Sequence, residues 1–161
     1  MTTRITTKIG DIFEIPLVDK YKKFMQYIAI DETQLKSSVV RVFELRYAMD
    51  DSPDLEDVVA DHVDFYAHTV LRFGITENIW RKVGKSRNVG QLNILFRGTN
   101  DFDKSKKISE SWFVWEVSGP VRTVGKLIRE FKCAESGSVV PAEQIVSRIK
   151  TGEYAFWHPG Y

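Results

Sequence analysis

The sequence contains one cysteine, no long apolar run and almost no net charge. Cys133 has no second cysteine to pair with, which excludes an internal disulfide. The 23 Lys and Arg residues nearly equal the 22 Asp and Glu residues, so the net charge of +1 provides no overall attraction to nucleic acid or an anionic membrane. No stretch reaches the roughly 18 consecutive apolar residues of a transmembrane helix. A charged partner would therefore have to bind a local patch.

The remaining composition is that of an ordinary globular protein. Hydrophobic residues make up 43% of the 161 residues, enough for a core without metals or disulfides. This length predicts a single globular domain over residues 1–161. The first 17 residues lack the apolar stretch of a signal peptide, and we expect a cytoplasmic protein with no membrane partner.

Short alternating and β-branched segments predict a mainly antiparallel sheet. Residues 9–17 alternate in hydrophobicity, Pro16 must lie at an edge or an end, and we expect this segment to be an edge strand. Residues 24–30 and 38–47 are rich in β-branched and aromatic side chains, and they complete a three-stranded meander. Further strands are predicted in three short apolar segments, at residues 79–84, 92–97 and 112–117.

Two segments predict helices. Ser52-Pro53-Asp54 is typical of a helix start, and one apolar face follows at Leu55, Val58, Val59, His62 and Val63. Residues 65–73 then return to the pattern of a strand, and residues 141–150 carry the signals of a C-terminal helix. The predicted fold class is α+β, with a partly barrelled, mainly antiparallel sheet, of which an SH3-like barrel is one form.

The largest charge imbalance is an acidic segment with no Lys or Arg. Its members are Asp50, Asp51, Asp54, Glu56, Asp57, Asp61 and Asp64. On a helix, Asp54, Asp57 and Asp61 would share one stripe, which would repel RNA and attract a basic partner. The alternative is a solvated helix face whose acids favour the N-terminal end of the helix dipole. The spacing does not fit a calcium-binding loop.

A basic run supports a second hypothesis, a small β-barrel protein that binds nucleic acid. Its residues are Trp80, Arg81, Lys82, Lys85 and Arg87, with Trp80 available for stacking. The alternative is a solubilising loop surface. The aromatic residues 154–161 could likewise form a contact surface or fold back over the core.

A third hypothesis is an enzyme that uses His62, His68 or Cys133. On one strand, His62, Asp64 and His68 would project from the same face and could bind a metal. Cys133 and His158 could act as nucleophile and base, but they lie in distant segments. The glycines form no phosphate-binding loop. These patterns are weak, and we expect no catalytic residue, no metal and no cofactor.

Three segments carry a family resemblance: Lys8–Leu17, with the pattern Lys-x-Gly-Asp-x-Phe-x-Ile-Pro-Leu, then Tyr27–Ile30 and Ile79–Gly84. Together they resemble the immunity protein 26 family of bacterial polymorphic toxin systems over residues 8–84. The pattern Gly-Asp-x-Phe is also typical of SH3-like barrels. The chain departs from the family at Lys20–Lys23 and in the acidic segment.

The resemblance implies a small cytosolic protein that binds a cognate toxin domain and neutralises it without catalysis. It assigns no residue to inhibition, because the binding surface differs with the toxin. The acidic segment is then the candidate partner-binding surface for a basic toxin, since complementary charge accelerates encounter.

Overall fold

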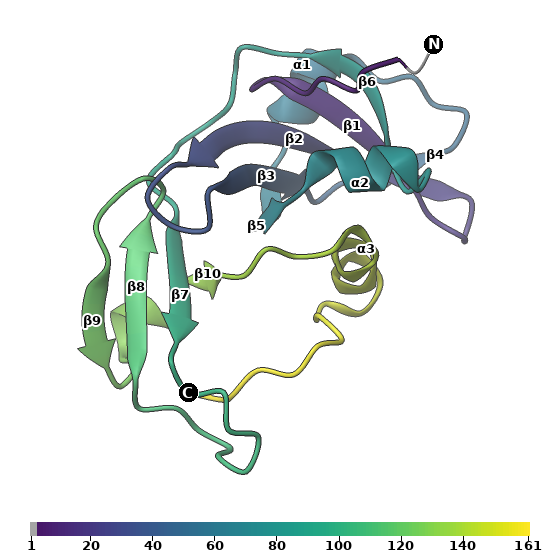
Figure 1. Cartoon of the computed structure of the whole chain (residues 1–161). Helices are drawn as coiled ribbons and strands as arrows, with labels where there is room; N and C mark the ends of the chain where they lie inside the picture. The colour runs from purple at the N-terminus through teal and green to yellow at the C-terminus, as the bar shows by residue number, and fades with distance from the viewer. Residues whose placement is uncertain (1–2) are drawn as a thin grey trace.

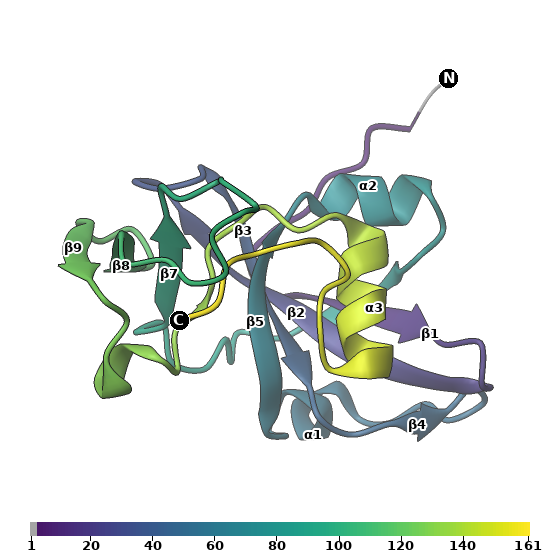
Figure 2. The same ribbon diagram turned by 90° about the horizontal axis from the view of Figure 1, so that it is seen from below.

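The computed structural model describes residues 3–161, which form two sheets and three short helices (Figures 1 and 2). The larger sheet contains β1 (Asp11–Pro16), β2 (Tyr21–Asp31), β3 (Ser37–Phe43), β4 (Tyr47–Ala48), β5 (Val63–Thr69) and β6 (Arg81–Lys85). The smaller sheet contains β7 (Leu95–Thr99), β8 (Trp112–Glu116), β9 (Arg122–Gly125) and β10 (Glu135–Ser136). The helices are α1 (Leu55–Val59), α2 (Leu71–Thr76) and α3 (Ala142–Thr151), with a 3-10 turn at Arg129–Phe131.

The strand pairing confirms a mainly antiparallel α+β fold but not the partial barrel. The larger sheet has the order β5-β3-β2-β1-β6, with β4 paired to β2, and the smaller one has the order β10-β7-β8-β9. In residues 3–161 neither sheet closes into a barrel, because β5 and β6 lie at opposite edges of the larger sheet. Beside β5, the chain before α3 makes one backbone hydrogen bond, from Val140 N to His68 O (2.8 Å), and Val140 O accepts another from Thr69 Oγ1 (2.7 Å).

The prediction of an edge position for the first strand is wrong. β1 pairs with β2 on one side and with β6 on the other. Pro16 is tolerated because it is the last residue of β1 and lies beyond Glu14, the last residue paired with β6. The alternating pattern predicted the strand but held no information about this pairing with a segment far along the chain.

Between residues 52 and 76 the helix and strand boundaries differ from the prediction. α1 starts as expected but ends at Val59, and β5 then begins at Val63. The strand does not continue to Phe73, because α2 begins at Leu71. Trp80 explains the change from strand to helix. A Cβ placed on Gly74 would lie 2.0 Å from the Trp80 indole, and Trp80 Nε1 donates a hydrogen bond to Leu71 O (3.1 Å). The glycine permits a close approach that local propensity does not report.

Side chains on both faces of the larger sheet form the core. On one face, residues such as Phe13, Met25 and Val40 pack with Ile145 of α3, which crosses this sheet in Figure 2. The other face packs against α1 and against the smaller sheet, through separate clusters around Phe43 and around Phe96 and Trp115. The α3 helix ends at Gly152, whose φ of 84° is the left-handed conformation expected of a glycine C-cap.

A buried carboxylate joins the two sheets. Asp31, at the end of β2, accepts hydrogen bonds from Trp115 Nε1 of β8 (2.8 Å) and from the backbone N of Ser118 (3.1 Å). It also pairs with His68 of β5, whose ring lies against that of Phe96, tilted by 58° with centroids 4.2 Å apart. The smaller sheet is therefore fastened to the larger one by polar as well as apolar contacts.

Part of the C-terminal tail folds back over the core, which is one of the two alternatives that the sequence left open; its role as a contact surface stays a prediction. Tyr154 and Phe156 pack against the core and stack with centroids 4.9 Å apart, whereas Trp157 remains 41% exposed. Figure 1 shows this tail, in yellow, running from α3 toward the end of β7. Of the helices in residues 3–161, none has the length and hydrophobicity needed to cross a membrane.

Candidate functional site

Four residues of the acidic segment have carboxylates that are available for a partner. Asp50, Asp51, Glu56 and Asp57 are all exposed. Within residues 3–161 their carboxylates make no hydrogen bond and no ion pair. They lie on the turn before α1 and on the first turn of that helix. The carboxylate of Asp57 also faces Tyr47: burial raises the pKa of the Tyr47 phenol, and the charges of Asp61 and Asp57 raise it further.

The other three acids are engaged in local structure. Asp54 caps α1 by accepting a hydrogen bond from the backbone N of Glu56 (2.9 Å). Asp61 accepts from the backbone N of Leu45 (2.8 Å) and of His62 (2.7 Å). Asp64 pairs with Lys23 Nζ (2.9 Å). The predicted stripe of Asp54, Asp57 and Asp61 is not formed, because α1 ends before Asp61.

The basic run lies on and after β6, an edge strand. Arg81 pairs with Glu14, and Lys82 Nζ pairs with Asp11 Oδ1 (2.9 Å). Lys85 and Arg87 are exposed and line one hollow, in which Glu56 also lies. Charged side chains on an edge strand oppose pairing with another chain's edge, which accounts for this run without a ligand.

Trp80 contradicts the stacking role expected for nucleic-acid binding. Its side chain is 2% exposed and lies against Gly74. A base could not reach this ring without unfolding α2. The sequence pattern placed Trp80 next to the basic residues, but Trp80 precedes β6 and its ring packs into the core with Leu71 of α2.

The structure also separates the residues proposed to bind a metal. His62 is exposed, Asp64 is paired with Lys23, and His68 is fully buried beside Asp31, with His68 Nε2 and Asp31 Oδ2 2.9 Å apart. In residues 3–161, no group of three or more His, Cys, Asp and Glu side chains is arranged to hold a metal ion.

Cys133 and His158 line a common hollow but make no hydrogen bond to each other. Cys133 Sγ lies 3.3 Å from Glu130 O. His158 Nδ1 lies 3.2 Å from the carbonyl of Pro159. The base of the proposed dyad is therefore directed to the backbone of its own segment.

The native structure favours the neutral form of His68 and the ionised form of Asp31. Burial lowers the pKa of His68 below its ordinary value, although the hydrogen bond to Asp31 and the charge of Asp31 act in the other direction. Burial raises the pKa of Asp31, but hydrogen bonds from Trp115, His68 and two backbone N–H groups more than offset this, so that its pKa is lowered. A neutral imidazole that donates from Nε2 to an ionised Asp31 satisfies both, and it leaves Nδ1 with no partner in the described structure.

An aromatic cleft that the sequence did not predict lies between the β7–β8 loop and the C-terminal tail. Its volume is about 470 Å³. Its aromatic lining is contributed by Phe102, Trp112, Phe113, Phe156 and Trp157. The aromatic tail was visible in the sequence, whereas its meeting with the loop between β7 and β8 was not predicted. That meeting depends on the backbone pairing of Gly160 with residues 107–109, through Gly160 N to Lys107 O (2.7 Å) and Ser109 N to Gly160 O (3.0 Å).

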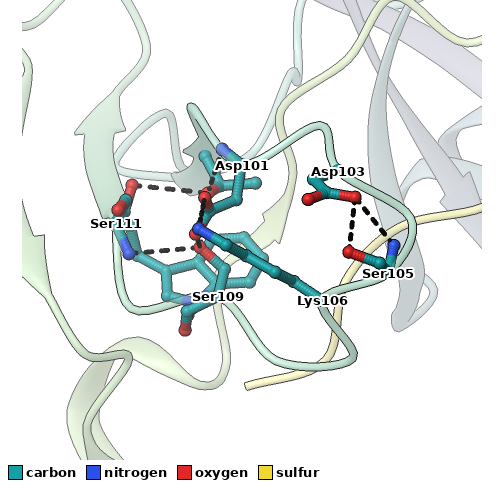
Figure 3. Close-up of polar contacts among 8 residues, drawn as sticks. Asp101, Asp103, Ser105, Lys106, Ser109 and Ser111 are labelled. Atoms are coloured by element: carbon teal, nitrogen blue, oxygen red, sulfur yellow. Dashed lines mark hydrogen bonds and ion pairs between the residues drawn. The ribbon is translucent and has the colours of Figure 1, made fainter.

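The loop that forms one wall of the cleft is cross-linked by its own side chains (Figure 3). Asp101 accepts hydrogen bonds from Ser109 Oγ (2.9 Å) and Lys106 Nζ (3.1 Å). Asp103 accepts from the hydroxyl and the backbone N of Ser105 (2.7 and 2.9 Å). The bonds from Lys106 and Ser109 lower the pKa of Asp101. The loop therefore presents a defined shape to the cleft.

The fold is a two-sheet α+β arrangement that carries an acidic segment around α1 and an aromatic cleft beside β7. A family model, immunity protein 26, matches residues 8–107. The chain belongs to the immunity protein 26 family, whose members are typically non-enzymatic proteins of polymorphic toxin systems. The match confirms the resemblance seen in the sequence and extends past residue 84, where that resemblance weakened. Neither the curated proteins nor the solved structures gave a match.

Proposed function

We propose that this protein neutralises a cognate toxin by binding it through the acidic segment, on a basic surface that the toxin needs for its activity. Family membership supports toxin neutralisation in general. The observation that carries the choice of surface is the set of four unpaired, exposed carboxylates at the start of α1. We infer that neutralisation takes place in the cytoplasm, where a lone cysteine stays reduced.

Charge complementarity explains how this surface would act. Asp50, Asp51, Glu56 and Asp57 lie close together in the chain, and residues 50–64 contain no Lys or Arg. Such a patch attracts a basic partner over roughly one Debye length, about 10 Å at 0.1 M salt, and so raises the association rate. Asp54, Asp61 and Asp64 contribute to the same field while they hold the local fold.

The test uses the toxin domain encoded beside this protein's gene. We expect the two proteins to co-purify. A variant with Asp50→Asn, Asp51→Asn, Glu56→Gln and Asp57→Asn should associate about tenfold more slowly at low salt, with the difference shrinking as salt increases. Stopped-flow mixing measures the association rates of the wild type and the variant at each salt concentration.

A matched control removes the same number of charges elsewhere. Glu77, Glu116, Glu130 and Glu143 are exposed residues outside the acidic segment. Replacing all four with Gln should leave the association rate close to that of the wild type. Equal slowing in both variants would show an effect of net charge alone, and no slowing in the first would reject the acidic surface.

Nucleic-acid binding receives no support as a second function. Trp80 is buried, and Arg81 and Lys82 are paired with carboxylates of β1. In residues 3–161, Lys85 and Arg87 are the exposed cations of this run that pair with no carboxylate, and two are too few for the phosphate contacts that give nucleic-acid affinity at physiological salt.

A further inference from the structure

We propose that the aromatic cleft receives an extended segment of the toxin, one that carries an aromatic or long aliphatic side chain next to a carboxylate. This inference rests on the proposed function, because it names a second contact with the same partner. The acidic segment would set the rate of encounter, and the cleft would set the lifetime of the complex.

The cleft exposes more aromatic surface than core packing requires. Phe102, at its rim, is 79% exposed, and Trp157 on the opposite wall is 41% exposed. A Cβ placed on Gly98 would lie 2.6 Å from the Phe113 ring, so any side chain at residue 98 would displace this ring from the cleft wall. Clustered exposed aromatic side chains around a hollow are typical of protein contact sites.

The backbone of β7 favours an extended occupant. β10 pairs with β7 only at Phe96 and Arg97, where Gly137 N donates to Arg97 O (2.7 Å). Backbone groups two residues apart in a strand point to the same side, so those of Thr99 are directed to the cleft side, beyond the end of β10. An added strand could pair there and place alternate side chains beside Trp112 and Phe113, which project from opposite faces of β8.

The charges of the cleft select a carboxylate. Asp101 is neutralised by Lys106 (3.1 Å), but in residues 3–161 Arg97 has no carboxylate within ion-pair distance. The Arg97 guanidinium donates to Ala134 O and lies 4.7 Å from the centroid of the Tyr161 ring. It is half-buried, which strengthens its attraction for an anion. A carboxylate on the toxin segment would neutralise the charge of Arg97.

The position of the cleft in the chain suits recognition of one particular partner. The family model ends at residue 107. Phe102 and the end of β7 lie inside that match, whereas Trp112, Phe113 and the tail residues Phe156 and Trp157 follow it. Most of the aromatic lining is therefore supplied by the part of the chain outside the matched family segment.

The experiment measures binding of the same toxin domain to single variants by surface plasmon resonance. We expect Phe102→Ala and Trp157→Ala to raise the dissociation rate about tenfold or more, with little change in association rate. Arg97→Gln should act in the same direction, and Arg97→Lys should retain more affinity because it keeps the charge. The matched control is Phe73→Ala, because Phe73 is an exposed aromatic residue on α2, 52% accessible.

The outcomes separate the two proposals. Wild-type dissociation rates in the Phe102→Ala and Trp157→Ala variants would overturn the role of the cleft while leaving the acidic surface intact. An equal effect of Phe73→Ala would also overturn it. If the wild-type chain does not bind the toxin, the proposed function and this inference both fail. A dimer that Phe102→Ala dissociates in analytical ultracentrifugation would assign the cleft to a second copy and reject the toxin segment.

Discussion

His68 shows how far a residue's role depends on its surroundings. The sequence suggested a metal ligand, but the ring is fully buried and pairs with Asp31 between the two sheets. Asp31 lies 37 residues earlier in the chain, and Trp115, the other side-chain donor to it, lies 84 residues from Asp31. No local pattern could have brought these three together.

The lowered pKa of His68 predicts a loss of stability in acid. The unfolded chain takes up a proton near the ordinary value of 6.5, while the native state resists it, so the free energy of unfolding should decrease as the pH falls below about 6.5. Asp31 adds a further loss below its ordinary value of 3.8, because its native pKa is also lowered.

Urea unfolding at pH 7, 6 and 5 measures this dependence. The His68→Gln variant keeps an N–H donor near Asp31 but cannot titrate, so its stability should change less across this range than that of the wild type. Identical pH profiles for the two proteins would mean that other groups cause the dependence.

At the scale of elements, local patterns predicted best where one face of a segment is buried. The strands β1, β2, β3, β7 and β8 and the helix α3 were found from alternation, β-branched content and end signals. The failures lie at the junction of β5 and α2, where contact between Gly74 and Trp80 decides the geometry, and at the position of β1 in the sheet. The position of β1 depends on its pairing with β6, far along the chain, whereas Gly74 and Trp80 are near in sequence and their close approach is not reported by local propensity.

The acidic segment was found from composition, but its division into free and engaged carboxylates was not. Asp54, Asp61 and Asp64 are bound by groups whose positions depend on the fold, such as the backbone N of Leu45 and the amine of Lys23. The aromatic cleft escaped prediction for the same reason.

The N-cap of α1 provides a prediction at this scale. Asp54→Ala removes the acceptor for the backbone N of Glu56, and we expect a loss of about 1 kcal/mol in the free energy of unfolding. Asp54→Ser keeps an acceptor and should retain most of the free energy of unfolding that Asp54→Ala loses. Asp57→Ala, on the same helix, should cost less than about 0.5 kcal/mol. Chemical denaturation compares the three; equal losses for Ala and Ser at position 54 would exclude capping as the cause.

At the scale of the whole molecule, a substitution at the junction of the two sheets should destabilise the smaller sheet more than the larger one. Trp115→Phe removes one hydrogen bond to Asp31 and leaves the buried carboxylate under-satisfied, a loss of about 1–3 kcal/mol. Amide hydrogen exchange should increase most in β7–β9, with β1–β3 less affected.

Trp112→Phe is the matched control. The Trp112 indole donates to Ser109 O (2.9 Å), within the β7–β8 connection and away from the junction. The substitution should affect that loop and the buried cluster of Trp112 with Val114 and Leu127, but not the junction. Exchange that increases equally in both sheets of the Trp115→Phe variant would show that they unfold as one unit.

The backbone pairing of Gly160 with residues 107–109 has a practical consequence for every binding assay. Gly160 and Tyr161 follow His158 and Pro159 of the cleft wall, so an affinity tag fused after Tyr161 would begin two residues from the cleft. Figure 1 shows β1 far from this end of the chain. A tag on the amino-terminal side leaves the cleft open, but Thr6 and Lys8 line a hollow with Glu56, so that tag should be removed before binding at the acidic segment is measured.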